Sequence, residues 1–119
     1  LLNAGMIFEA IVLMLNNITA NSVFYKKALK LEGAVTFNQI AMKCVYEMFM
    51  NIISEKSTGK KSKYRWLTPE VISTYYAQSL CFITEGWIAQ GMDDIEPKEM
   101  AEAYMYLITR SMDDILSEL

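Results

Sequence analysis

The 119-residue sequence contains no histidine, and this absence restricts the chemistry open to it. Histidine is the side chain that titrates near neutral pH and the commonest metal ligand in proteins. The sequence also lacks a glycine-rich phosphate loop and the spacing of a nucleophile elbow. We therefore expect the protein not to be an enzyme and to bind neither a metal nor a cofactor.

Proline and glycine are scarce, with two and five residues, while hydrophobic residues make up 53% of the chain. This composition is typical of a packed helical protein. The longest apolar run, from Met6 to Leu15, is interrupted by Glu9 and is shorter than the roughly 18 residues that span a bilayer. We expect no membrane association. Glu9 is placed at the solvent edge of its helix, the alternative being a carboxylate that faces an internal cavity.

The two cysteines, Cys44 and Cys81, form no Cys-x-x-Cys pair. A disulfide framework is therefore not expected, and a reducing cytoplasm fits better. We interpret both as small buried residues. The alternative, a redox sensor, requires an exposed thiol with a lowered pKa.

Charge is unevenly distributed along the chain. Residues 1–68 carry nine basic and four acidic side chains, whereas residues 69–119 carry two basic and ten acidic ones. An acidic C-terminal half does not favour contact with a phosphate backbone. The basic segment 57–67 includes Tyr64 and Trp66, a combination that also occurs in nucleic-acid contacts. We interpret it as a solvated connection with Trp66 packed on the core.

The spacing of apolar residues predicts an all-α domain with five helices and no strand. The expected helices span 5–18, 23–31, 36–56 and 68–91, and the last begins near Pro97 and runs almost to the end. In the second helix, Phe24 is expected to face inward. The links are short, so residues 1–119 are expected to form one domain.

The helix at 68–91 organises the rest of the chain. Thr68 can cap the start of this helix, Pro69 suits its first position, and Gly91 suits its end. The only charged residues within it are Glu70 and Glu85. Its large side chains are expected to pack into the chain's own core: Val71, Ile72, Tyr75, Tyr76, Leu80, Phe82, Ile83, Trp87 and Ala89. Its small-residue face is expected to meet a second copy of the chain: Ser73, Ala77, Cys81, Thr84 and Ile88. The alternative is a central helix in a monomeric bundle.

Methionine and aromatic side chains are abundant, with nine Met, seven Tyr, five Phe and two Trp. Helical bundles lined by such side chains can enclose small apolar molecules. The candidate ligand-binding residues are Met42, Tyr46, Phe49, Tyr76, Leu80 and Ile83. The alternative for each is a fully packed core.

Four short motifs occur in an order that resembles a known family. Asn21-x-x-Phe24-Tyr25-Lys26 opens a short helix, and Tyr75-Tyr76-Ala77 and Trp87-Ile88-Ala89-Gln90-Gly91 lie in the penultimate one. Pro97-Lys98-Glu99-Met100-Ala101 begins the last helix. Together they resemble the C-terminal domain of TetR-family transcriptional regulators, in the branch common in Firmicutes, over nearly the whole chain.

The resemblance implies a homodimer in which the last two helices pair with those of the second subunit as a four-helix bundle. The candidate interface residues are Ser73, Ala77, Cys81, Thr84, Ile88, Tyr104, Ile108, Met112 and Ile115. It also implies a small apolar effector in the helical core. The chain begins with Leu1, and we expect an N-terminal helix-turn-helix domain before it that is absent from this sequence. Operator DNA is expected to be bound only through that domain. The alternative is a helical protein–protein interaction module without a small-molecule ligand.

Overall fold

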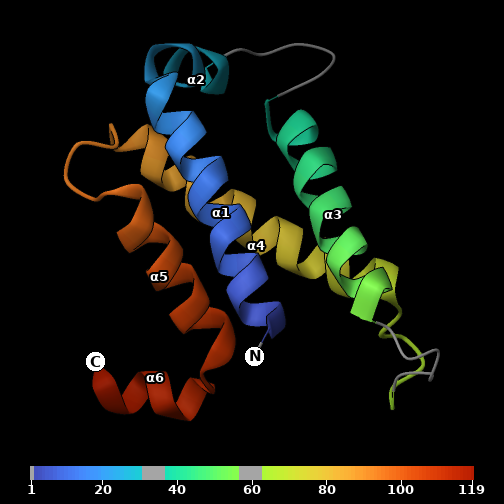
Figure 1. The fold of residues 1–119 in the computed structure, drawn as a ribbon. Coiled ribbons are helices and arrows are strands. Elements are labelled where there is room, and N and C mark those ends of the chain that lie inside the picture. The colour runs from blue at the N-terminus through green and yellow to red at the C-terminus, as the bar shows by residue number, and fades with distance from the viewer. Residues whose placement is uncertain (1, 31–36, 57–62) are drawn as a thin grey trace.

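The computed structural model describes residues 2–30, 37–56 and 63–119, and these residues form helices and connections without a strand. The helices are α1 (Leu2–Ala20), α2 (Ser22–Leu29), α3 (Phe37–Lys56), α4 (Pro69–Ala89), α5 (Pro97–Thr109) and α6 (Met112–Glu118) (Figure 1). The all-α prediction is confirmed. The expected segments 31–36 and 57–62 lie outside the described residues.

Local capping explains where α4 begins and ends. The Thr68 hydroxyl accepts a hydrogen bond from the Val71 amide at 3.2 Å, and Pro69 is the first helical residue. After Ala89 the chain leaves the helix through Gly91, whose φ is 100°, and Met92, whose φ is 62°. Glycine adopts positive φ without steric cost, so it suits this position. The predicted ends of this helix are therefore confirmed to within two residues.

The last predicted helix is two helices, and the prediction of a single one is wrong. Arg110 is extended, with ψ of 150°, and separates α5 from α6. The Ser111 hydroxyl then accepts a hydrogen bond from the Asp114 amide at 3.1 Å and caps α6. A serine in this position competes with helix continuation because its side chain replaces a backbone partner.

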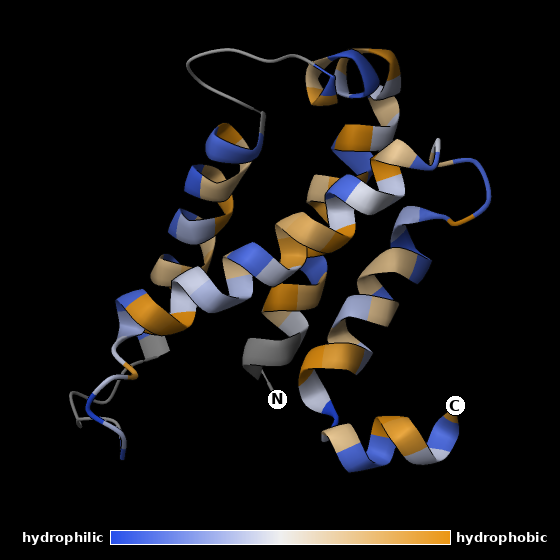
Figure 2. Cartoon of the chain, turned by 180° about the vertical axis from the view of Figure 1, so that it is seen from behind, coloured by the Kyte–Doolittle hydropathy of each residue, from blue (hydrophilic) through white to orange (hydrophobic). Residues whose placement is uncertain are grey.

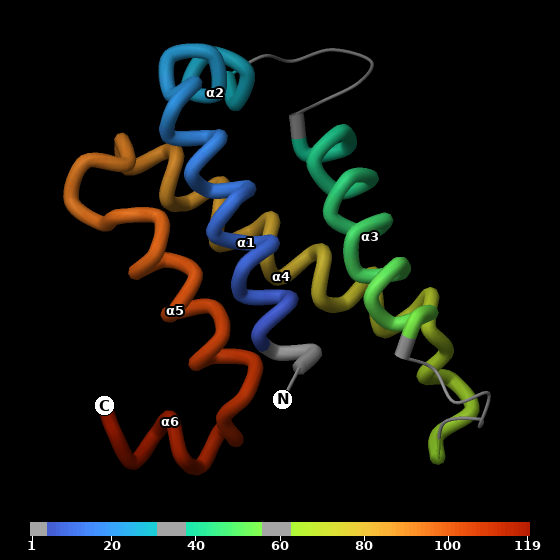
Figure 3. The backbone as a smooth tube through the Cα atoms, in the orientation of Figure 1, coloured from blue at the N-terminus to red at the C-terminus, as the bar shows by residue number. Residues whose placement is uncertain are grey.

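The helices form a flat assembly. Figure 1 and Figure 3 show α1 between α3 and α5, and Figure 2 shows α4 crossing the opposite side. The principal extents are 44, 39 and 23 Å, and the radius of gyration is 15.4 Å. A compact domain of this length has a radius of about 13.5 Å. The chain is therefore more extended than a compact monomer and leaves large faces open.

The core is built from the inner faces of α1, α3, α4 and α5. Its members are Ile11, Leu15, Ile18, Val45, Phe49, Ala77, Leu80, Cys81, Trp87, Ile88, Ala101 and Tyr104. The Tyr104 hydroxyl donates to the Tyr76 carbonyl at 3.1 Å and lies 2.9 Å from the Ser79 hydroxyl. The Trp87 indole N–H donates to the Ile95 carbonyl at 3.0 Å. These bonds connect α4 to α5 and to the segment before α5.

The predicted faces of α4 are largely reversed. Ser73 and Ala77, expected at a surface, are fully buried in the chain's own core. Tyr75 and Phe82, expected in the core, are 68% and 78% exposed. Helices approach most closely where their side chains are small, and this explains why the small residues lie on the inner side of α4. Leu80 and Trp87 are buried, as predicted.

Two further predictions about aromatic residues are wrong. Trp66 is 77% exposed, so it does not pack on the core, and Phe24 of α2 is 66% exposed. Glu9 is exposed, which confirms its place at a solvent edge.

No single helix in the described ranges has the length and apolarity to cross a membrane. Residues 5–20 and 22–29 form a pair of helices bent by 90°. This pair satisfies the criterion together, by length and composition alone.

Candidate functional site

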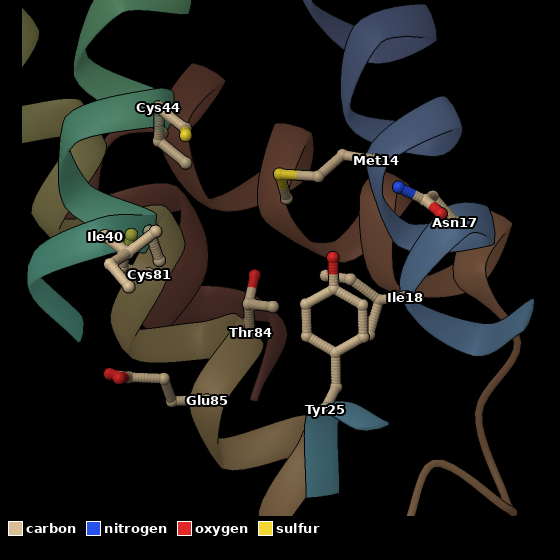
Figure 4. A pocket seen from close by; sticks show the side chains of 11 residues that line it. Met14, Asn17, Ile18, Tyr25, Ile40, Cys44, Cys81, Thr84 and Glu85 are labelled. Atoms are coloured by element: carbon tan, nitrogen blue, oxygen red, sulfur yellow. The ribbon is translucent and has the colours of Figure 1, made fainter. Parts of the chain in front are cut away.

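A cavity of about 160 Å³ lies where α1, α2, α3 and α4 meet. Its lining is mostly apolar and comes from all four helices: Met14, Asn17, Ile18, Tyr25, Ile40, Ala41, Cys44, Val45, Cys81, Thr84 and Glu85. Figure 4 shows Thr84 and Tyr25 projecting into the space between α1 and α3. The helices meet here because α2 turns away from α1 at 90°.

Thr84 is the polar group that defines the cavity. It is 6% exposed, and its hydroxyl has no hydrogen-bond partner among the described residues. A buried hydroxyl without a partner costs about 1–3 kcal/mol, because its bonds to water are lost on folding. By contrast, the Thr74 hydroxyl on the same helix bonds to the Glu70 carbonyl at 2.8 Å. The cavity therefore holds an unused hydrogen-bonding group at its wall.

Three sulfur-bearing side chains, Met14, Cys44 and Cys81, share the cavity wall. Burial is the main cause that raises the pKa of the Cys81 thiol to about 11, with smaller contributions from the nearby Glu85 and Cys44. Cys81 is thus a buried protonated thiol, as predicted, and a poor nucleophile at neutral pH. Cys44 is exposed, so the prediction that it is buried is wrong.

Among the described residues that line the cavity, Glu85 is the only charged one. The Asn38 side-chain amide donates to both oxygens of its carboxylate, at 3.2 and 3.1 Å. No lining residue in the described part of the chain is basic. The described residues also contain no group of three or more His, Cys, Asp or Glu side chains placed to hold a metal ion.

Comparison with known proteins assigns the chain to a family. The family model TetR_C_8, described as a transcriptional regulator C-terminal region, matches residues 6–110. The chain belongs to the TetR family of transcriptional regulators. No curated protein and no solved structure matches it. The resemblance drawn from the four motifs is therefore confirmed.

The predicted ligand-binding residues of this TetR-family domain do not line the cavity. Phe49 and Leu80 are 2% and 1% exposed in the packed core, and the Phe49 and Tyr76 rings stack at 5.7 Å between centroids. Met42 borders a separate hollow, Ile83 borders a groove, and Tyr46 packs beside the core. Cys81 and Thr84 do line the cavity, although the sequence pattern had placed them at the dimer interface.

Most of the predicted interface residues are inside the TetR-family domain. Ser73, Ala77, Cys81, Thr84 and Ile88 are between 0% and 6% exposed, and Tyr104 is 1% exposed. A second chain cannot reach these side chains, so the assignment of all six is wrong. Ile108 and Ile115 are partly buried, and Met112 is 75% exposed. Contact between these three residues and a second subunit stays a prediction.

The outer side of α4 presents a different apolar surface, which we call the outer stripe: Tyr75, Phe82, Gly86 and Ala89. Successive members are seven, four and three residues apart, which keeps them on one side of the helix. Phe82, Gly86 and Ala89 also border a groove of about 750 Å³ whose other wall includes Leu29, Ile95 and Met100. A Cβ atom added at Gly86 meets no atom of the described residues within 4 Å.

Proposed function

We propose that this TetR-family domain binds a small effector in the cavity between α1, α2, α3 and α4 and dimerises through the outer stripe of α4. Ligand binding changes the affinity for operator DNA of a helix-turn-helix domain that lies outside this sequence. The observation that carries the ligand role is the cavity itself, a mostly apolar space whose wall includes the Thr84 hydroxyl, unpaired within the described part of the chain.

The apolar lining and the unfilled volume of the cavity support ligand binding. Small-molecule sites are concave and mostly apolar, with a few polar groups that set orientation. A solely structural core fills its volume, because voids cost contacts and stability. The described residues of this domain instead leave about 160 Å³ open, and none of them is a hydrogen-bond partner for the buried Thr84 hydroxyl.

The outer stripe supports dimerisation through α4. Tyr75 and Phe82 are each more than two-thirds exposed, and large exposed aromatic side chains in a row mark an association surface. Gly86 lies inside the helix although glycine destabilises a helix interior by about 1 kcal/mol relative to alanine. A second backbone approaching closely at Gly86 explains why a side chain is absent there. Two-fold dimers are the commonest soluble oligomers.

Helix α4 takes part in both proposed roles, ligand binding and dimerisation. A ligand shifts an equilibrium only by its different affinity for the two states, and two DNA-binding heads must match the spacing of their half-sites. Because α4 forms part of the cavity wall and also carries the outer stripe, a ligand that moves α4 changes the relative position of the two subunits.

The first test is solution mass by light scattering over a concentration range down to low micromolar. We expect a dimer for the 119-residue chain and a shift toward monomer for Phe82→Glu. The matched control is Leu13→Glu on α1, since Leu13 is 72% exposed and lies outside the outer stripe. Circular dichroism of both variants checks that they remain folded.

A monomer at every concentration would contradict the proposed dimer. In that case the groove beside Phe82 favours the alternative function, a module that docks a helix from another protein. A dimer that withstands Phe82→Glu but not Leu13→Glu would keep dimerisation and reject the outer stripe as its surface.

A further inference from the structure

We propose that the cavity takes a neutral, single-ring aromatic molecule with one hydroxyl group, the phenol class, whose oxygen hydrogen-bonds to Thr84. This inference rests on the proposed ligand role of the cavity and adds the chemical class of the ligand. It follows from the size of the cavity, the Thr84 hydroxyl, which has no partner among the described residues, and the charges around it.

The volume sets the size of the ligand. An engineered cavity of about 150 Å³ in another protein stays dry and binds benzene. The cavity here, at about 160 Å³, has room for one aromatic ring and a small substituent. Methionine and thiol sulfur atoms make favourable contacts with aromatic rings, and Met14, Cys44 and Cys81 supply three of them.

The Thr84 hydroxyl sets the polar group. A purely apolar ring would leave this buried hydroxyl without a partner among the described residues and the ligand. A ligand hydroxyl can donate to it or accept from it, so binding restores a hydrogen bond that folding removed. A site built to pair a polar group also discriminates against analogues that lack that group.

The charges of the lining residues disfavour an anionic ligand. A carboxylate or phosphate would lie near Glu85 without a basic partner among the lining residues described. An unpaired ion in an apolar site is strongly disfavoured. The Glu85 carboxylate, for its part, is already held by the Asn38 amide, so it does not require a cation for its hydrogen bonds.

The experiment compares four one-ring probes: phenol, benzene, benzoate and benzylammonium. Each is titrated into the 119-residue chain, and the NMR signal of the Met14 methyl group in the cavity wall reports binding. The test variant is Thr84→Val, which replaces the hydroxyl with a methyl group of similar size.

The matched control is Thr74→Val on the same helix, because the Thr74 hydroxyl bonds within α4 and does not line the cavity. Ala41→Leu fills the cavity and serves as a second variant.

We expect phenol to bind the wild-type chain and to lose roughly ten-fold in affinity with Thr84→Val, the worth of about one hydrogen bond. The affinity for benzene should change less than two-fold in Thr84→Val. The control Thr74→Val should leave the affinities for phenol and benzene unchanged. Ala41→Leu should abolish the binding of both probes. Equal losses for phenol and benzene in Thr84→Val would overturn the hydrogen bond to Thr84. Preference for benzoate or benzylammonium would overturn the ligand class alone. If no probe shifts the Met14 signal, the ligand class fails and the proposed ligand role fails with it, while the dimer test stands separately.

Discussion

Thr84 and Phe82 are two positions apart in α4 and point to opposite sides of the helix. Thr84 is 6% exposed and lines the cavity, whereas Phe82 is 78% exposed on the outer stripe. Two residues correspond to a rotation of about 200° around a helix, so neighbouring positions reach the two surfaces. A displacement of α4 at the cavity therefore reaches the outer stripe without any intervening element.

Thr84→Val should stabilise the unliganded chain while it weakens phenol binding. The substitution removes a buried hydroxyl that has no partner among the described residues, and we expect a gain of about 1 kcal/mol in the free energy of unfolding. Urea unfolding followed by circular dichroism measures it. A loss of stability would mean that the hydroxyl has a structural partner in the folded chain.

Ser73 and Ser79 should respond to alanine in opposite directions. Ser73 is fully buried and its hydroxyl has no partner in the described structure, so Ser73→Ala should be neutral or stabilising by about 1 kcal/mol. The Ser79 hydroxyl bonds to the Tyr76 carbonyl at 2.8 Å and contacts the Tyr104 hydroxyl, so Ser79→Ala should lose about 1 kcal/mol. The same urea series compares them, and changes of equal sign would contradict the hydrogen-bond assignment.

Tyr104 should make the chain sensitive to alkali. Burial raises the pKa of Tyr104 to about 12 from the usual 10.0. The unfolded chain then loses this proton at lower pH than the folded one, so the stability present below pH 10 falls as pH rises toward 12. Tyr104→Phe should cost roughly 1 kcal/mol at pH 7 through its lost hydrogen bonds and should reduce the alkaline fall.

The control for this pH series is Tyr64→Phe, because Tyr64 is 60% exposed and lies outside the outer stripe. Cys81 contributes a fall of the same sign between pH 9.0 and about 11, so the fall should be reduced and not abolished in Tyr104→Phe. An unchanged alkaline profile in Tyr104→Phe would rule out Tyr104 as its source.

Gly86→Ala should separate helix stability from dimerisation. In the isolated chain the added methyl group meets open space, and alanine favours a helix interior by about 1 kcal/mol. If Gly86 lies against a second subunit, the same methyl group obstructs the contact and the dimer dissociation constant rises. Sedimentation velocity at several concentrations measures it. Gly5→Ala on α1 is the matched control, since a Cβ atom there also meets nothing within 4 Å.

The helix boundaries of this chain were predictable because capping is local. Thr68 and Pro69 mark the start of α4 within a few residues of sequence, and Gly91 follows its end. The break at Ser111 carried the same kind of signal, a serine three residues before Asp114, but the apolar spacing on both sides concealed it.

Which side of α4 faces inward was not predictable from its pattern. With only two charged residues, the helix gives no polar face as a reference, so size alone had to decide. Small residues such as Ala77 allow close helix crossing and become buried, while the large Phe82 is left outside. The cavity depends on where four helices fail to fill space together. The unfilled space between the four helices results from tertiary packing, so the pattern of a single helix does not predict it.

The two tryptophans occupy opposite environments, and this gives the chain its own optical probes. Trp66 is 77% exposed, whereas Trp87 is 5% exposed and its indole N–H is held by the Ile95 carbonyl. A solvated indole emits at longer wavelength than a buried one, so the fluorescence spectrum has two separable components. The shorter-wavelength component reports the connection between α4 and α5 without a chemical label.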